Sequence, residues 1–208
     1  MSWLLSAPNP VKAQVTAEPS AVIFPDPAKF ARGLYTEGEV GAVSFFGPAG
    51  ANVAPGFAVG TRVGYDLFRW LAVQAHFLGS THSIRGSRTV MGLDAMGQPT
   101  PVLQPNPQAG QLLQTYQAIA EGKLTIRFGQ TSLFAEGGAG LERLSTNVLY
   151  TLMLERYRIG FTAGGGGGFD YHSLSRHFSV GLRGDYFWMR EISGSRDLMV
   201  TTYLRYTF

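Results

Sequence analysis

The fold is decided by the stretch Leu198-Met199-Val200-Thr201-Thr202-Tyr203-Leu204-Arg205-Tyr206-Thr207-Phe208, in which apolar and polar residues alternate up to the last position. One face carries Leu198, Val200, Leu204, Tyr206 and Phe208; the other carries Asp197, Met199, Thr201, Tyr203, Arg205 and Thr207. A period of two is typical of a β-strand. We expect an exposed aromatic end where a strand faces lipid, as in transmembrane β-barrels. An ordinary amphipathic edge strand has the same local pattern, so the rest of the chain must decide.

Seven further segments repeat this alternation, at about 34–46, 56–66, 70–79, 112–128, 133–144, 156–171 and 177–188. Eight such segments predict an all-β protein, an eight-stranded antiparallel up-and-down transmembrane β-barrel over residues 34–208. The segments are about as long as a tilted strand that spans a bilayer. The connections after the second, fourth and sixth segments are short, and the others are longer. We therefore expect outer-membrane localisation, with short turns and both termini in the periplasm.

Two of the long connections are predicted to lack regular structure. Residues 47–55 form a loop rich in Gly, Pro and Asn, and residues 80–110 form the longest irregular stretch. The second contains four prolines, Pro99, Pro101, Pro105 and Pro107, which oppose both helix and central strand.

Composition excludes several classes of protein. Charged residues make up 15% of the chain, against about 25% in soluble proteins, and 27 of the 208 residues are Gly. The absence of Cys excludes disulfides and thiolate metal sites. The net charge of +3 is scattered, so nucleic acid is not an expected partner. No apolar run approaches the length of a transmembrane helix, no pair of His has metal-ligand spacing, and we expect no cofactor and no metal.

The N-terminal residues predict two short regions before the barrel. Residues 1–13 look like the remnant of a truncated signal peptide, with Val11-Lys12-Ala13 as a cleavage site before Gln14. A basic region and a full apolar core are missing, so we expect that the true start lies upstream. A disordered Pro-rich tail is the open alternative. Residues 14–33 are expected to be a periplasmic lead-in containing Pro19, Pro25 and Pro27, with a short helical turn at 28–32.

Alternation alone does not say which face is outside, because a soluble ligand-binding barrel alternates with its apolar face inward. Here the apolar face lacks charge over the middle of each strand, and aromatic residues gather near strand ends, as in interfacial belts. The polar face carries charges of both signs. These define a predicted barrel-interior network: Glu37, Glu39, Arg62, Asp66, Glu121, Lys123, Arg127, Glu136, Glu142, Arg158, Asp170, Arg183, Asp185 and Arg205.

The interior of an eight-stranded barrel is just wide enough to be filled by side chains. Because buried charges persist only when paired, we expect these residues to form salt bridges that plug the lumen. A narrow channel is the alternative. The run Gly164–Gly168 is expected to make room for a bulky neighbouring side chain or for a strong bend of the strand. A phosphate-binding loop would need a following helix, and none is predicted.

Some small outer-membrane barrels are lipid-modifying enzymes, and this chain has candidate nucleophiles and bases. They are His76 or His82 with Ser80 or Ser83, and His172 with Ser173 or Ser175 near Asp170 or Asp185. Catalysis would need a Ser–His hydrogen bond and a third group that orients the His. We predict instead that these residues belong to the polar lumen and to a solvated turn, and that the protein is not an enzyme.

The terminal Tyr206-Thr207-Phe208 and the hairpin Val63-Gly64-Tyr65-Asp66-Leu67-Phe68-Arg69-Trp70-Leu71-Ala72-Val73 resemble the small eight-stranded outer-membrane family of the OmpA transmembrane domain and OmpX. The last strand also resembles the C-terminal signature by which Gram-negative outer-membrane proteins are recognised. That resemblance implies an assembly signal at Leu204, Tyr206 and Phe208 that binds the barrel assembly machinery.

A second resemblance is to the adventurous gliding motility family of myxobacteria typified by CglE. It rests on 26–33, 37–43, 78–82, 134–141 and 203–206. It implies a non-enzymatic outer-membrane part of a motility complex. We therefore predict a structural or interaction component of the cell envelope, in contact with outer-membrane lipid and with other envelope proteins through the 80–110 loop or the 14–33 lead-in.

Overall fold

The computed structural model describes residues 32–145, 159–172, 177–189 and 195–208. The predicted signal remnant at 1–13 and nearly all of the 14–33 lead-in therefore lie outside the described residues. Arg158, Ser173 and Ser175 lie outside them as well.

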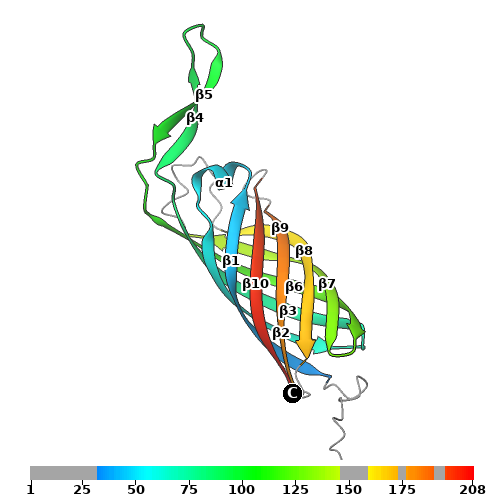
Figure 1. Cartoon of the computed structure of the whole chain (residues 1–208). Coiled ribbons are helices and arrows are strands. Elements are labelled where there is room, and N and C mark those ends of the chain that lie inside the picture. The colour runs from blue at the N-terminus through cyan, green and yellow to red at the C-terminus, as the bar shows by residue number, and fades with distance from the viewer. Residues whose placement is uncertain (1–31, 146–158, 173–176, 190–194) are drawn as a thin grey trace, which may run out of the picture.

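Eight antiparallel strands close into a barrel, which confirms the predicted fold (Figure 1). They are β1 Leu34–Phe46, β2 Gly56–Asp66, β3 Leu71–Ser83, β6 Leu112–Phe128, β7 Thr131–Leu144, β8 Ile159–His172, β9 Phe178–Met189 and β10 Arg196–Thr207. Each strand pairs with its sequence neighbour around the barrel, in the order β1-β10-β9-β8-β7-β6-β3-β2. The barrel closes where β1 pairs with β10, with Glu37 opposite Arg205. The first and last strands are thus held by the same kind of ladder as every other pair.

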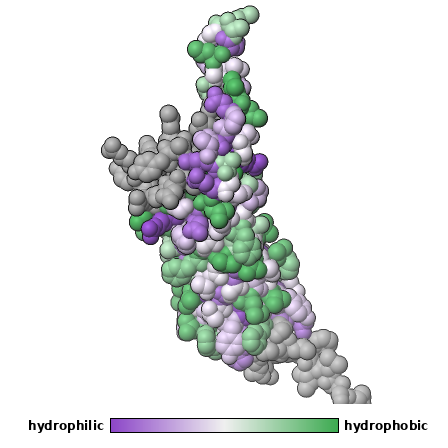
Figure 2. Space-filling view, turned by 90° about the vertical axis from the view of Figure 1, so that its left-hand side faces the viewer, coloured by the Kyte–Doolittle hydropathy of each residue, from purple (hydrophilic) through white to green (hydrophobic). Residues whose placement is uncertain are grey.

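Side chains alternate between an apolar outer wall and a largely polar interior. Figure 2 shows apolar side chains spread over the outer wall of the barrel, where Val59, Phe77, Leu182 and Leu204 are all exposed. Most charged side chains of the barrel strands point inward and are buried, whereas Arg143 on β7 and Arg196 on β10 are exposed on the outer wall. This arrangement is the reverse of a soluble ligand-binding barrel and is what a bilayer requires of a membrane-spanning barrel. Among the described residues, no helix has the length and apolar character needed to cross a bilayer.

The prediction of an irregular stretch over 80–110 was wrong. β3 continues to Ser83, and the stretch then forms a hairpin of β4 Ser87–Leu93 and β5 Pro99–Pro105, which projects beyond one end of the barrel (Figure 1). We call this unit the β4–β5 hairpin and the barrel end beside it the hairpin end; the opposite end, where β10 finishes, is the terminal end.

The hairpin tolerates its prolines because of where their nitrogens point. The amide of Asp94 donates to the carbonyl of Gln98 at 2.9 Å, and the amide of Asn106 donates to Gly86 at 3.0 Å. These two bonds fix the even-numbered positions as the hydrogen-bonded pairs, because the pattern alternates along an antiparallel ladder. Pro99, Pro101 and Pro105 occupy odd positions, so no ladder bond is lost.

The loop predicted at 47–55 contains a short helix, α1 Pro48–Asn52. Gly47 precedes it with φ of 75°, a backbone conformation that Gly adopts without strain, and Pro48 stands in the first turn, where it costs no hydrogen bond. The amide of Val53 donates to the carbonyl of Ala49 at 3.0 Å. α1 was not predicted, because its five residues are too few to show the apolar periodicity of a helix.

The glycine run Gly164–Gly168 lies within strand β8, so it is not a phosphate-binding loop. A Cβ on Gly164 would come within 2.7 Å of the Phe187 ring, and one on Gly168 would come within 2.8 Å of the Phe134 ring. The backbone carbonyls of Tyr186 and Leu182 on β9 would lie closer still to these two Cβ atoms. The glycines therefore make room both for the adjacent β9 backbone and for bulky lumenal neighbours, the second of which was expected from the sequence.

Candidate functional site

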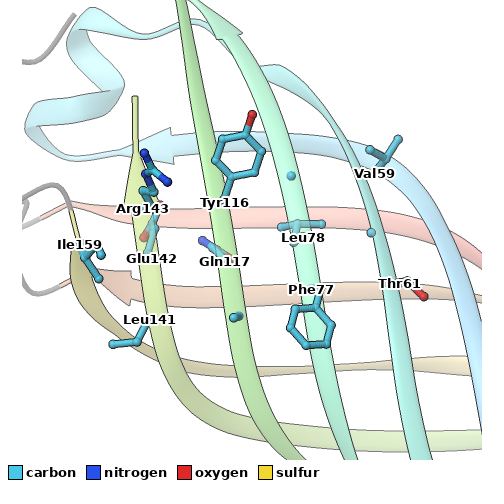
Figure 3. Close-up of a pocket in the computed structure, with 13 residues that line it drawn as sticks. Val59, Thr61, Phe77, Leu78, Tyr116, Gln117, Leu141, Glu142, Arg143 and Ile159 are labelled. Atoms are coloured by element: carbon cyan, nitrogen blue, oxygen red, sulfur yellow. The ribbon is translucent and has the colours of Figure 1, made fainter. Parts of the chain in front are cut away.

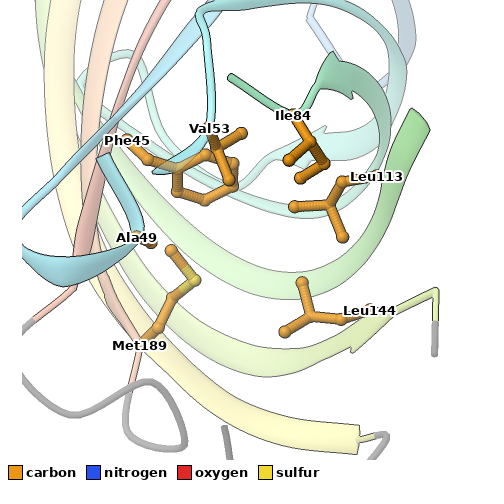
Figure 4. Packing of buried hydrophobic residues seen from close by; sticks show 7 residues of the cluster. All are labelled: Phe45, Ala49, Val53, Ile84, Leu113, Leu144 and Met189. Atoms are coloured by element: carbon orange, nitrogen blue, oxygen red, sulfur yellow. The ribbon is translucent and has the colours of Figure 1, made fainter. Parts of the chain in front are cut away.

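The lumen is closed at the hairpin end by an apolar cap. Figure 4 shows Phe45, Ala49, Val53, Ile84, Leu113, Leu144 and Met189 gathered there, and all seven are buried. α1 places Ala49 at the barrel mouth, and the amide of Ala49 donates a hydrogen bond to Ser195 Oγ at 3.1 Å. The cap is contributed by side chains from six different segments of the chain, so it ties the strand ends together.

A second apolar layer lies deeper in the lumen. It is formed by Val43, Ala58, Leu78, Ile119, Phe187 and Met199, which are all buried. On β1, β2, β6 and β9, these residues lie two or four positions nearer the hairpin end than the first charged lumenal residue that follows toward the terminal end. Most of the charged lumenal groups therefore lie toward the terminal end, whereas Glu142 and Asp197 lie toward the hairpin end.

Arg62 is the centre of the charged layer. Its guanidinium lies 2.8 Å from Glu39, 3.2 Å from Glu121 and 3.0 Å from Asp185, and 3.5 Å from Glu136. All of these side chains are buried. The planar guanidinium suits this role because it carries five donors in a fixed geometry.

A second guanidinium and an imidazole extend the same network. Arg183 lies 2.8 Å from Glu37, 3.1 Å from Glu39 and 2.8 Å from Glu136. His76 reaches Glu39 through Nε2 at 2.6 Å. The carboxylate of Glu39 is therefore shared by three side chains, those of Arg62, His76 and Arg183.

Toward the terminal end the cations also stack on aromatic rings. Lys123 Nζ lies 3.8 Å from the centre of the Phe134 ring, and the guanidinium of Arg205 lies 3.6 Å from that of Tyr35. Arg205 also pairs with Asp66 at 2.5 Å. Desolvated cation–π contacts of this kind are worth about 2 kcal/mol.

All the predicted network residues that the structure describes point into the lumen: Glu37, Glu39, Arg62, Asp66, Glu121, Lys123, Arg127, Glu136, Glu142, Asp170, Arg183, Asp185 and Arg205. Several lumenal partners were missing from that prediction, among them Tyr35, Gln74, His76, Gln117, Phe134, Asp197 and Tyr203. Gln74 binds Glu121 at 2.6 Å, and Asp197 accepts from Gln117 at 2.9 Å. Their parity along the strands was the available signal, because each shares the face of a charged residue.

The three residues predicted as an assembly signal lie at the terminal end of β10. Leu204 and Phe208 are exposed on the outer wall, and Tyr206 is half-buried between the rings of Phe178, at 4.9 Å, and Phe208, at 5.0 Å. They form part of an aromatic rim. Their recognition by assembly machinery stays a prediction.

One Ser–His pair has hydrogen-bonding geometry that catalysis would need. Ser80 Oγ lies 2.7 Å from His82 Nε2 and 2.6 Å from Thr115 Oγ1, and His82 Nδ1 faces the carbonyl of Ala54 at 3.2 Å. Both side chains are buried beneath the apolar cap, where the Phe45 ring lies 4.6 Å from the imidazole. A substrate could reach the pair only if the cap opened.

The second candidate group has a different arrangement. His172 Nε2 lies 3.1 Å from Ser132 Oγ, and the same hydroxyl donates to Asp170 at 3.2 Å. The acid thus contacts the hydroxyl, whereas a triad needs the acid on the imidazole. In the part of the chain that the structure describes, no three His, Asp or Glu side chains are placed to hold a metal ion.

The β4–β5 hairpin, unlike the lumen, exposes large apolar side chains to solvent. Met91 is 70% exposed, Leu93 73%, Leu103 70% and Met96, at the tip, 88%. The tip turn is ordered by Asp94, whose Oδ1 accepts from the amides of Met96 and Gln98, each at 2.8 Å. A monomeric protein seldom exposes so many large apolar side chains together, so the hairpin is a candidate interaction site.

A closed eight-stranded barrel with an apolar outer wall and paired charges inside defines the class: this is a transmembrane β-barrel of the outer-membrane type. Comparison with family models and with curated protein sequences found no match. Among solved structures, the barrel is similar to Neisserial surface protein A, with a TM-score of 0.58 and 12% identity over 86% of this chain and 99% of that one.

Two structures of Ail, the attachment invasion locus protein of Yersinia pestis, also match. The complex with the heparin analogue sucrose octasulfate has a TM-score of 0.45 and 12% identity, over 85% of this chain and 99% of that chain. The second has a TM-score of 0.43 and 13% identity, with the same coverage. Identities this low concern the fold alone.

Proposed function

We propose that this protein is a non-enzymatic outer-membrane barrel that holds the β4–β5 hairpin outside the cell as a docking site for another protein. The single observation that carries the proposal is the contrast between a lumen filled by paired side chains and an apolar hairpin that projects from it. The hairpin end has the longer connections, which in outer-membrane barrels face outward. Both termini then lie in the periplasm.

The packed lumen supports a mechanical role over catalysis or conduction. Two buried apolar clusters and a network of paired charges fill the lumen of the described barrel with side chains, which favours a closed barrel over a channel. The Ser80–His82 pair is buried beneath the cap, which argues against a role of these residues in catalysis. The resemblance to the gliding motility proteins gives one specific setting for such a barrel, as an anchored part of a motility complex.

The hairpin's backbone specifies the kind of partner. On β5, three of the four outward nitrogens belong to Pro99, Pro101 and Pro105 and carry no hydrogen, so this edge cannot pair with another strand. On β4, the outward positions 87, 89, 91 and 93 all keep their amide hydrogens. A partner strand can therefore add to β4 alone, with its apolar side chains on the face of Met91 and Leu93.

Proline substitutions test this mode of binding. A photocrosslinking residue at position 93 in intact cells first identifies the partner, and the purified partner is then titrated against refolded barrel. Met91→Pro removes an outward amide of β4 and leaves the β4–β5 ladder intact. We expect at least a tenfold loss of affinity, because the added strand loses a hydrogen bond and meets the proline ring.

Leu103→Pro is the matched control, because Leu103 has the same 70% exposure as Met91 but lies on the edge that is already closed. Its affinity should stay within about twofold of the wild type. Equal losses in both variants would assign binding to the apolar face and not to the edge. Unchanged binding after deletion of residues 87–105 would overturn the proposed function itself.

A further inference from the structure

A hollow lies on the outer wall of the barrel. It has a volume of about 680 Å³ and runs across β2, β3, β6 and β7 to the start of β8. Figure 3 shows Val59, Phe77, Tyr116, Leu141 and Ile159, which are outward-facing residues of these five strands. Its surface is almost entirely apolar, as expected for a site that faces lipid.

The hollow exists because two small residues interrupt two rows of large ones. Gly79 is paired with Val59 on one side and Tyr116 on the other. In the next row Ala118 is paired with Phe77 and Leu141. The Tyr116 ring leans over the gap, since a Cβ on Gly79 would lie 3.7 Å from it. The small residues therefore form a floor between aromatic and aliphatic walls.

One margin of the hollow is polar. Arg143 lies there, paired with Tyr116 and Ile159 in the sheet, and its side chain is exposed on the outer wall. The hydroxyl of Tyr116 donates to Gln114 at 3.3 Å, and Ser145 accepts from the amide of Gln114 at 3.0 Å. The site thus joins an apolar floor to a cationic and hydrogen-bonding rim.

Arg143 has no counter-ion within the described part of the protein. Of the acidic residues there, only Asp94 lies outside the lumen, and it belongs to the tip of the hairpin. A guanidinium beside the bilayer is stabilised by an anion, and phosphate fits its geometry in a bidentate manner.

We propose that this hollow binds one acyl chain of an anionic membrane lipid, with the lipid's phosphate paired to Arg143. The acyl chain lies over Gly79 and Ala118 between the walls, and the headgroup lies at the polar margin. None of the residues that line the hollow belongs to the β4–β5 hairpin, so this proposal does not depend on the proposed docking function.

Native mass spectrometry of the delipidated, refolded full chain tests the proposal, with phosphatidylglycerol and phosphatidylcholine of identical acyl chains as probes. The wild type should retain one phosphatidylglycerol molecule. Detergent should displace phosphatidylcholine at a concentration about tenfold lower than the concentration that displaces phosphatidylglycerol. Arg143→Gln should abolish this preference, whereas Gly79→Leu, which fills the floor, should lower retention of both lipids at least tenfold.

Two control variants match these changes. Arg196→Gln removes an exposed outer-wall cation on β10, outside the hollow, and Gly122→Leu adds a side chain to an exposed outer position of β6 with open space around it. Both should retain phosphatidylglycerol as the wild type does. Glycerol phosphate, the headgroup without acyl chains, should not compete.

Three results would overturn the proposal. Equal retention of the two lipids by the wild type would remove the role of Arg143. Loss in Arg143→Gln together with unchanged retention in Gly79→Leu would mean a headgroup contact only and no acyl site. Equal losses in Gly79→Leu and Gly122→Leu would mean general binding to the wall.

Discussion

Replacing Arg62 with Gln tests whether the lumenal network holds the barrel together. Arg62 is fully buried and lies within 3.5 Å of four carboxylates, those of Glu39, Glu121, Glu136 and Asp185. Gln removes the charge that all four share. Breaking a buried ion pair by removing one partner costs about 3–5 kcal/mol. Because four carboxylates lose one cation, we expect a loss near the upper end of that range.

A loss of this size lowers the folding equilibrium constant by roughly two to three and a half orders of magnitude, at about 1.4 kcal/mol for each factor of ten. Urea unfolding in lipid vesicles, followed by tryptophan fluorescence, measures the free energy of unfolding. A gel comparing boiled with unboiled samples gives a second reading of the folded fraction. Arg62→Lys should be intermediate, because one ammonium cannot span four carboxylates in the way that a guanidinium does.

Arg196→Gln is the control, since Arg196 is exposed on β10 and takes part in none of these pairs. Its free energy of unfolding should stay within about 0.5 kcal/mol of the wild type. If Arg62→Gln were as stable as this control, the carboxylates would be compensated without Arg62. The lumenal network would then not be what stabilises the barrel.

Four further outcomes are expected. In planar bilayers the wild type should show no steady conductance, and a reproducible open state would contradict the packed lumen. Phe187→Ala should lower the free energy of unfolding by about 3–5 kcal/mol by leaving a cavity in the second apolar layer, and no change in urea unfolding would contradict that packing. His82→Ala and His172→Ala should leave the lipid A mass spectrum of the cells unchanged. A missing or new lipid A species would instead support the alternative of a lipid-modifying enzyme. Deletion of residues 87–105 should leave the gel shift between boiled and unboiled samples intact, because these residues form a separate sheet outside the barrel. Loss of the shift would show that the barrel needs the hairpin to fold.

The barrel itself could be predicted from the sequence because its signal is local and repeated. Alternation sets which side of the sheet each residue faces, and it placed Glu37 and Arg183 in the lumen although they are far apart in the chain. The near absence of charge over the middle of the strands on the other face then indicated that the apolar side meets lipid. Each step needed only the order of residues within one strand.

The hairpin and α1 could not be predicted in the same way. Prolines at 99, 101 and 105 oppose a strand in general, and they are tolerated here because the register of one particular ladder turns their nitrogens outward. α1 depends on the barrel mouth, where Ala49 finds an apolar cluster. The partners of Arg62 come from four other strands, so only closure of the barrel brings them together.

The proline edge of β5 also limits how large an assembly can grow. A ribbon with two open edges can take a strand on each side and so seed an endless sheet, as in fibrils. A ribbon that is open on β4 and closed on β5 accepts one strand and then terminates. Crowded side by side in a membrane, many copies of this protein could each hold one guest strand without their hairpins polymerising through β5 into a continuous sheet.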